Sequence, residues 1–182
     1  LAARLAERFP EVGVAERARF AVVLLDEYQD TNHAQLVLLR ALFGGGHPVT
    51  AVGDPCQSIY GWRGANAGTL TTFGREFRDS SGTDAVQASL TTSFRNGARI
   101  LAVANRLALP LRAEGLDVPV LYPSERSADD HVVVSLHLTA DDEAGDIARR
   151  ARAFWDHSVE GRTVAVLVRA RSQIPRLEAA LR

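Results

Sequence analysis

Two adjacent acidic residues follow directly on a short apolar run near the start of the chain. The run FAVVLL covers residues 20–25, and Asp26 and Glu27 come next, with Asp30 three residues further on. Carboxylates at the end of a strand can hold Mg²⁺ against nucleotide phosphates, and an adjacent Glu can orient or deprotonate a water. Acidic residues that cap the following helix would give the same pattern. The pair by itself leaves both interpretations open.

A second group of unusual side chains follows another apolar run, residues 49–52. Residues 53–65, GDPCQSIYGWRGA, combine glycines, a proline and an amide with two large aromatic residues and an arginine. Tyr60, Trp62 and Arg63 are of the types that stack on the bases of single-stranded nucleic acid. The alternative is an aromatic plug beneath a structural loop.

A third candidate is Arg95, which lies in the sequence SFRN just before a stretch with helical spacing. An arginine in this place can be a finger that reaches a γ-phosphate. It can equally be an exposed residue at a helix start with no further role.

Alternation of apolar runs with helical patterns predicts an α/β fold with parallel sheets flanked by helices. Ligands of such sheets bind beyond the carboxyl ends of the strands, where the candidate residues lie. The first strand is expected to be buried on both faces, because its apolar run is continuous. Strands are predicted at residues 20–25, 49–52, 132–138 and 163–168. Helices are predicted at residues 32–43, 66–78, 97–113 and 141–158, and another begins near residue 172.

Local signals set the expected ends of these helices. Thr31 or Asp30 is expected to cap the helix at 32–43, and the glycines at 44–46 to end it. Pro110 predicts a kink or an early end in the helix at 97–113. A loop is expected at residues 79–84, and a seam between two strand–helix sets near residues 85–93.

Composition limits the classes of protein to be considered. The 182 residues are 46% hydrophobic and 24% charged, which is typical of a globular protein. No apolar run approaches the about 18 residues of a membrane helix, so no membrane partner is expected. The single Cys56 excludes an internal disulfide and favours a reducing compartment, and a cytoplasmic location is predicted. Because the net charge is only -1, any contact with nucleic acid must be local.

Four segments carry a resemblance to a known family. They are DEYQDTN (26–32), VGDPCQSIYGWRGA (52–65), TSFRNGARIL (92–101) and VAVLVRARSQIPRLEAAL (164–181). In this order they resemble motifs II, III and IV, and the segment before the second insertion, of UvrD/Rep/PcrA-like superfamily 1A DNA helicases. The second segment is most similar to actinobacterial helicases, among them the RecBCD-like AdnA/AdnB helicase–nuclease motors.

The resemblance implies parts of two RecA-like motor lobes. Residues 1–90 would be the carboxyl part of lobe 1A, and residues 91–182 the first part of lobe 2A. ATP would be hydrolysed between the lobes, with Mg²⁺, to drive 3′ to 5′ movement along single-stranded DNA in repair or recombination. The implied partners are single-stranded DNA, junctions of single- and double-stranded DNA, the remainder of the parent chain, and a second motor or nuclease subunit.

The resemblance also implies roles at the nucleotide. Asp26 would bind Mg²⁺ and Glu27 would activate the hydrolytic water. Gln57 would sense the γ-phosphate and couple it to DNA movement, and Arg95 would reach the γ-phosphate from the second lobe. Phe94 stands where the family usually has a Tyr that stacks on adenine, so it keeps the stacking face and loses the hydroxyl.

Four residues are implied in binding DNA. Tyr60, Trp62 and Arg63 would lie on the single-strand track, with Trp62 stacking on a base. Arg169, at the end of a predicted second-lobe strand, would touch the DNA backbone.

The family's phosphate loop has no counterpart here, and neither do its last two motifs. The phosphate loop G-x-G-K-[ST] needs a Lys, and this chain has none, because all 21 of its basic residues are Arg. We therefore expect an excerpt of a longer ATP-dependent DNA helicase, inactive on its own. The alternative is a non-catalytic helicase-like module kept as a DNA-binding or partner-docking scaffold. Against it stand the intact Asp26, Glu27, Gln57 and Arg95.

Overall fold

The computed structural model describes residues 1–66, 68–127, 130–156 and 163–182. They form two compact units, residues 1–131 and residues 132–182, and each is described by itself. The fold is mixed α/β, with short parallel sheets flanked by helices, as expected. The division by packing differs from the lobe boundary expected between residues 90 and 91, which stays a prediction.

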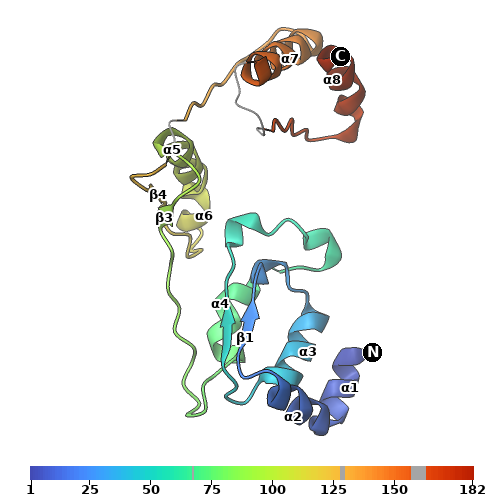
Figure 1. Ribbon diagram of the computed structural model, residues 1–182, viewed down its shortest axis with the longest axis vertical. Helices are drawn as coiled ribbons and strands as arrows, with labels where there is room; N and C mark the ends of the chain where they lie inside the picture. Colours follow the sequence, from blue (N-terminus) through green and yellow to red (C-terminus); the bar gives the residue numbers. More distant parts are fainter. Residues whose placement is uncertain (67, 128–129, 157–162) are drawn as a thin grey trace. The chain divides into compact units, whose positions relative to one another are not determined.

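A two-stranded parallel sheet joins the two apolar runs of the first unit. Strand β1 (Val23–Leu25) pairs with β2 (Val49–Ala51), with Val23 opposite Val49 and Leu25 opposite Ala51. Helix α3 (His33–Phe43) makes the connection between them, and α4 (Gly68–Glu76) follows β2 (Figure 1). The strand–helix–strand unit expected from the sequence is confirmed.

The expectation that the first strand is buried on both faces is wrong. Leu24 is 76% exposed, whereas its neighbours Val23 and Leu25 are partly buried. Successive side chains of a strand point to opposite faces of the sheet. In the described part of the first unit, packing therefore covers the face that carries Leu25 and leaves the face that carries Leu24 open.

The core of the first unit forms between the sheet of β1 and β2 and the helices α3 and α4. Tyr28, Leu36 and Phe77 are its buried members, and Phe73 packs against them. The Tyr28 ring meets Phe73 edge-on at 5.3 Å between centroids, and Phe73 stacks on Phe77 at 5.0 Å. Because Tyr28 follows Glu27 directly, this aromatic packing anchors the chain immediately after the acidic pair.

Burial raises the pKa of Tyr28 to about 12, and the nearby Glu76 carboxylate adds to the shift. An unfolded Tyr has a pKa of about 10. Between these values the folded state holds a proton that the unfolded state has lost, so the stability that Tyr28 contributes is full below about pH 10 and is lost as pH rises through about 12. We expect Tyr28→Phe to flatten the alkaline fall of the unfolding free energy in urea titrations at pH 9 and pH 11.

At neutral pH the same substitution is expected to change stability by less than about 1 kcal/mol, because the buried hydroxyl has no hydrogen-bond partner among the described residues. Tyr122→Phe is the matched control, since Tyr122 is 58% exposed. An unchanged pH dependence in Tyr28→Phe would contradict the assignment.

Helix α3 begins at His33, one residue later than predicted, and its cap is not one of the two expected residues. Residues Tyr28–Asp30 form the 3-10 turn η1, so neither Thr31 nor Asp30 is in position to cap α3. The cap is Asn32, whose Oδ1 accepts from the N–H of Gln35 at 3.0 Å, while Gln35 Oε1 accepts from the N–H of Asn32 at 2.9 Å. Gly44 follows the last residue of α3, as expected.

Two further helices precede the sheet. Helices α1 (Ala2–Arg8) and α2 (Pro10–Arg19) pack against α3. A Cβ at Gly13 would lie 2.7 Å from the carbonyl oxygen of Ala41, so α2 approaches α3 too closely for any larger residue there.

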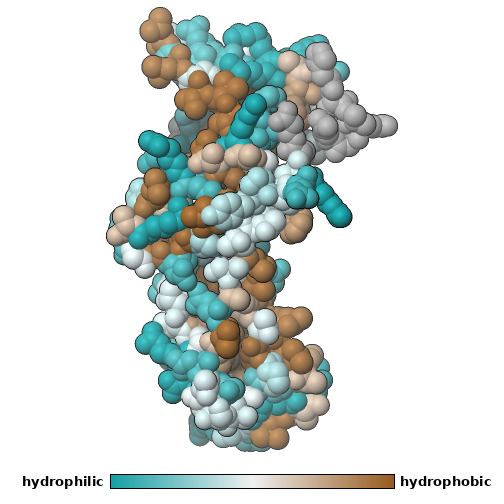
Figure 2. Space-filling model, turned by 90° about the vertical axis from the view of Figure 1, so that its left-hand side faces the viewer, coloured by the Kyte–Doolittle hydropathy of each residue, from teal (hydrophilic) through white to brown (hydrophobic). Residues whose placement is uncertain are grey.

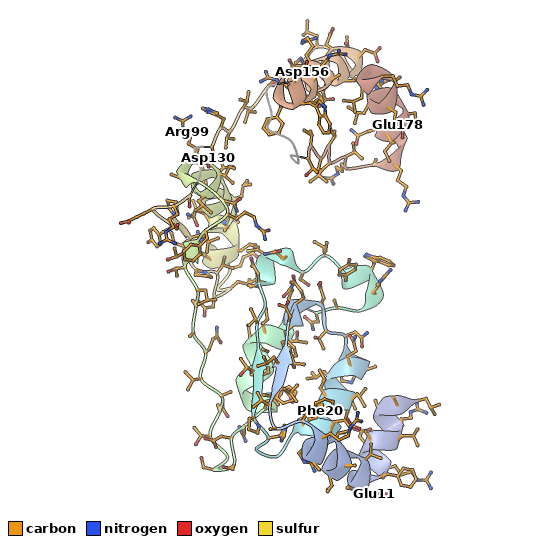
Figure 3. The ribbon with its side chains drawn as sticks, viewed as in Figure 1. Glu11, Phe20, Arg99, Asp130, Asp156 and Glu178 are labelled. Atoms are coloured by element: carbon orange, nitrogen blue, oxygen red, sulfur yellow. The ribbon has the colours of Figure 1, made fainter. Side chains whose placement is uncertain are left out.

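The stretch from residue 91 to 131 forms a smaller strand–helix set. Strand β3 (Thr92–Ser93) pairs in parallel with β4 (Tyr122–Pro123), and α5 (Ala98–Leu107) follows β3. The Asp130 carboxylate accepts from the N–H groups of Arg99 and Ile100, at 3.1 and 2.7 Å, in the first turn of α5 (Figure 3). This places a negative charge at the positive end of the helix dipole.

The helix expected at 97–113 ends early, as Pro110 indicates. It divides at Ala108 into α5 and the short α6 (Leu109–Ala113). A proline removes a backbone donor and clashes with the preceding turn, so it is tolerated only in the first turn of a helix.

The second unit consists of helices and extended segments. Helix α7 (Ala140–Asp156) packs against α8 (Ile174–Leu181), which the 3-10 turn η4 (Arg171–Gln173) precedes. Arg176 pairs with Asp141 at 2.8 Å between these helices. The helix expected at 141–158 is confirmed up to residue 156, and its last two residues lie outside the described ones.

The two strands predicted in this unit are wrong. Residues 132–138 and 163–168 carry no strand in the described chain, and Val134, Leu136 and Leu138 are 92–101% exposed. A strand exists only where its backbone bonds to a neighbour, and neither segment has such a ladder among the described residues.

Figure 2 shows hydrophobic side chains exposed at several places on the surface. None of the helices in the described ranges has the length and apolar character needed to cross a membrane.

Candidate functional site

The acidic pair lies at the carboxyl end of β1. Asp26 and Glu27 are both exposed, and the N–H of Glu27 donates to Asp26 Oδ1 at 3.0 Å. Glu27 has a φ of 50°, in the left-handed region that residues other than glycine seldom adopt. Such backbone strain is concentrated at functional sites. Here it lets the chain turn out of the strand directly after Asp26 and enter η1.

The ends of β1 and β2 are held side by side by backbone bonds. The N–H of Val52 donates to the carbonyl of Leu25 at 2.8 Å, and the N–H of Tyr28 donates to the carbonyl of Val52 at 2.9 Å. The ladder therefore continues past both strands. It brings the acidic pair and the loop that begins at Gly53 to the same edge of the sheet, as the sequence predicts.

Gln57 lies in this second loop, in the 3-10 turn η2 (Pro55–Gln57). Its Nε2 donates to Asp54 Oδ2 at 2.9 Å, and Asp54 Oδ1 accepts from the N–H of Cys56 at 2.8 Å. The Gln57 side chain is exposed and tethered at one end. The pKa of the Cys56 thiol is raised by desolvation and then by the Asp54 carboxylate, even though the residue as a whole is exposed.

Gln29 connects the two loops, although the sequence analysis did not single it out. It is 1% exposed. Its Nε2 donates to Glu27 Oε2 at 2.6 Å, and its Oε1 accepts from the N–H of Asp54 at 3.0 Å. The only signals in the sequence are an amide two residues after the candidate base and a glycine, Gly53, opposite it. Neither is specific before the two strands are paired.

An aromatic group lies further along the second loop, around the 3-10 turn η3 (Gly61–Arg63). Trp62 is 75% and Tyr60 39% exposed, with their ring centroids 6.4 Å apart. The Arg63 guanidinium lies 4.5 Å from the Trp62 centroid and 5.3 Å from that of Tyr60. Because Trp62 is largely exposed, it is not a plug beneath the loop. The group offers two rings and a cation to solvent.

Two contacts fix this aromatic loop to the segment that carries the acids. Ser58 Oγ donates to the carbonyl of Gln29 at 3.3 Å, and Asn32 forms an isolated antiparallel bridge with Ala65. Gly64 has a φ of 85°, which closes the turn between η3 and that bridge. The segment of Asp26 and Glu27, the turn of Gln57 and the aromatic loop are thus joined through one short framework.

Phe94 and Arg95 lie between β3 and α5. Both are exposed, Phe94 by 75%, and the N–H of Asn96 donates to Ser93 Oγ at 3.3 Å within the same turn. Among the described residues, no hydrogen bond or ion pair joins Phe94 or Arg95 to the acidic pair or to Gln57. Their contact with a nucleotide stays a prediction.

Arg169 is exposed and belongs to the second compact unit, whereas all the other candidates belong to the first. The strand expected to end at Arg169 is not formed. The contact of Arg169 with DNA stays a prediction.

The donor set suits Mg²⁺ bound together with a nucleotide. In the described part of the chain, no group of three or more His, Cys, Asp or Glu residues could hold a metal on its own. Magnesium at nucleotide sites takes only one or two carboxylates, completed by phosphate oxygens and water. The exposed carboxylate of Asp26 at the end of β1 fits that requirement.

The chain is similar in sequence to known DNA helicases. Residues 1–78 match the family model of the UvrD/REP helicase N-terminal domain. The chain is 32% identical over 175 residues to DNA helicase II of Escherichia coli (strain K12), a match that covers 91% of this chain and 22% of that protein. It is 41% identical over 106 residues to ATP-dependent DNA helicase UvrD1 of Mycobacterium tuberculosis (strain ATCC 25618 / H37Rv), covering 54% of this chain and 13% of that protein.

A further relative is ATP-dependent DNA helicase PcrA of Bacillus subtilis (strain 168), which is 36% identical over 104 residues, 57% of this chain and 13% of that protein. The chain thus spans less than a quarter of the length of each of these relatives. Together the matches support a UvrD-like helicase.

Proposed function

We propose that this chain is part of an ATP-dependent DNA helicase of the UvrD-like kind, which hydrolyses ATP between two lobes and moves along single-stranded DNA. One observation carries the proposal. The acidic pair at the end of β1 and Gln57 in the loop after β2 meet at one sheet edge, and that loop continues into the exposed group of Tyr60, Trp62 and Arg63. A nucleotide site and a base-stacking site share one framework.

At the nucleotide, each residue has a separate task. Asp26 would hold Mg²⁺, which supplies positive charge to the β- and γ-phosphates when bound. Glu27 acts as the general base that orients and deprotonates the attacking water. The tethered Gln57 amide contacts the γ-phosphate. Arg95 donates to the same phosphate from the second lobe, and Phe94 stacks on the adenine.

At the DNA, the exposed rings of Tyr60 and Trp62 stack on the bases. Base–aromatic stacking is worth about 1–3 kcal/mol per base, which holds a strand and still allows release. Arg63 over Trp62 adds a cation beside the ring without base specificity. Arg169 contacts the DNA backbone.

The finer identity of the parent protein belongs to the same proposal. Translocation runs 3′ to 5′, on single-stranded DNA and junctions, in DNA repair or recombination. The rest of the parent chain supplies the phosphate loop, whose Lys this chain does not contain, so the 182 residues alone hydrolyse no ATP. A motor subunit of a helicase–nuclease, of the AdnA/AdnB kind, is an alternative setting for the same site.

Trp62→Ala in the full-length parent is expected to weaken single-stranded DNA binding by about 5- to 150-fold, which corresponds to one lost stacked base. The ATPase rate in the presence of DNA should fall more than the rate without DNA. Both are measured by titrating an oligonucleotide into a phosphate-release assay. Tyr122→Ala is the matched control, because Tyr122 is also exposed and lies outside the aromatic loop.

Equal loss of both rates in Trp62→Ala would place the indole in the fold and not on the DNA. A wild-type parent that binds DNA and hydrolyses no ATP in this assay would favour the scaffold alternative over the motor.

A further inference from the structure

We infer that Gln29 is a positioning residue, which fixes the Glu27 carboxylate for catalysis and couples it to Gln57. The inference rests on the proposed function, since it needs Glu27 as the base and Gln57 at the γ-phosphate. It adds a residue that lies between them and touches neither nucleotide nor DNA.

The orientation of the Gln29 amide is determined by its two partners. The backbone N–H of Asp54 can only donate, so the atom 3.0 Å from it is the oxygen Oε1. The Glu27 carboxylate can only accept, so the atom 2.6 Å from its Oε2 is the nitrogen Nε2. In a flipped amide, Nε2 would face the N–H of Asp54 and Oε1 would face the Glu27 carboxylate. Neither pair can form a hydrogen bond, so both contacts exclude the flipped orientation.

The surroundings leave Gln29 no other position. The residue is 1% exposed, and its backbone carbonyl accepts from Ser58 Oγ at 3.3 Å. A Cβ at Gly53 would lie 2.7 Å from Gln29 Oε1 and 3.2 Å from its backbone nitrogen. Only glycine at position 53 lets the second loop approach closely enough for the amide to bridge it. Gln29 is therefore buried and held by several contacts, in contrast to the exposed Glu27 that it bonds.

Three hydrogen bonds make a continuous path between the two proposed catalytic groups. Glu27 Oε2 accepts from Gln29 Nε2, Gln29 Oε1 accepts from the N–H of Asp54, and Asp54 Oδ2 accepts from Gln57 Nε2 at 2.9 Å. A phosphate that displaces the Gln57 amide acts on Asp54, and the shift reaches the carboxylate through Gln29. The bond holds Glu27 by Oε2 and so fixes how the carboxylate is presented to the water.

The test is Gln29→Met in the full-length parent, because Met has a similar length and volume and cannot bridge the two loops. We expect kcat of DNA-stimulated ATP hydrolysis to fall about 10- to 100-fold, the cost of a misplaced catalytic group. KM for ATP and the affinity for single-stranded DNA should stay within about twofold. Gln29→Glu, which keeps an acceptor for the N–H of Asp54 and opposes Glu27 with a like charge, should lose at least as much.

Two comparisons separate positioning from mere stability. Phe43→Leu is the matched control, since Phe43 is buried at the opposite end of α3, and it should lower Tm without lowering kcat in the folded protein. In a Glu27→Gln background, Gln29→Met should cause no further loss of hydrolysis, because a carboxylate that is absent cannot be misplaced.

Several results would overturn the inference. They are an unchanged kcat in Gln29→Met, an added loss in the Glu27→Gln background, a loss expressed in KM alone, or a failure of both Gln29 variants to fold, which would assign Gln29 to the fold. A wild-type parent without ATP hydrolysis would instead overturn the proposed function itself. With an active wild type, the variants decide the role of Gln29 alone.

Discussion

Replacement of Glu27 by Gln in the full-length parent is expected to lower ATP hydrolysis by about 10²- to 10⁴-fold. The amide keeps the size of the carboxylate and cannot take a proton from water. Binding of ATP should be retained, because the Asp26 carboxylate and Gln57 remain in place. Phosphate release gives the rate, and fluorescence titration with a labelled ATP analogue gives the affinity.

Glu11→Gln is the matched control for this change. Glu11 is exposed in the first turn of α2 and lies outside the candidate site, so its rate should equal that of the wild type (Figure 3). Normal turnover in Glu27→Gln would remove Glu27 from the role of base. A loss of ATP affinity as large as the loss of rate would make it a binding residue.

Arg95→Ala in the parent is expected to reduce hydrolysis by about 10³-fold or more, the effect of losing an arginine finger. In the proposed role the guanidinium would stabilise the charge that develops on the γ-phosphate, so the loss should appear in kcat more than in ATP affinity. Arg95→Lys should recover little of it, because a Lys ammonium lacks the planar fork that contacts two phosphate oxygens.

The matched control for Arg95→Ala is another arginine of the same strand–helix set. Arg106 is exposed near the end of α5 and outside the candidate site, and Arg106→Ala should leave kcat unchanged. An Arg95→Ala variant with normal hydrolysis and weakened DNA binding would move Arg95 from the nucleotide to the DNA. Equal effects of the two substitutions would leave Arg95 as an ordinary surface residue.

The sequence alone determined the α/β class and the shared sheet edge of Asp26, Glu27 and the loop that carries Gln57. Short apolar runs and turn glycines are local signals, so β1, β2 and the helix between them could be placed within a few residues. Once two consecutive strands are parallel, their carboxyl ends must share an edge. Asp26, Glu27 and Gln57 were therefore brought together by rules that need no further contacts.

Tertiary structure decided those features that depend on contact with another segment of the chain, such as strand formation and the burial of a sheet face. Residues 132–138 have the alternation of a strand and form none in the described chain, because a ladder requires a neighbour as well as a pattern. Leu24 is exposed for the same kind of reason, since a continuous apolar run cannot say which face of a sheet is covered.

Gln29 shows most clearly the difference between what the sequence indicates and what the tertiary structure adds. Its sequence position, two residues after Glu27, indicates nothing about a bridge. The bridge exists because a strained φ at Glu27, a glycine at position 53 and the pairing of β1 with β2 place three groups within hydrogen-bond distance. Residue types and order were sufficient to propose the chemistry, because chemistry depends on functional groups. Only the packed structure could show how the proposed base, Glu27, is held, because that depends on distances between residues far apart in sequence.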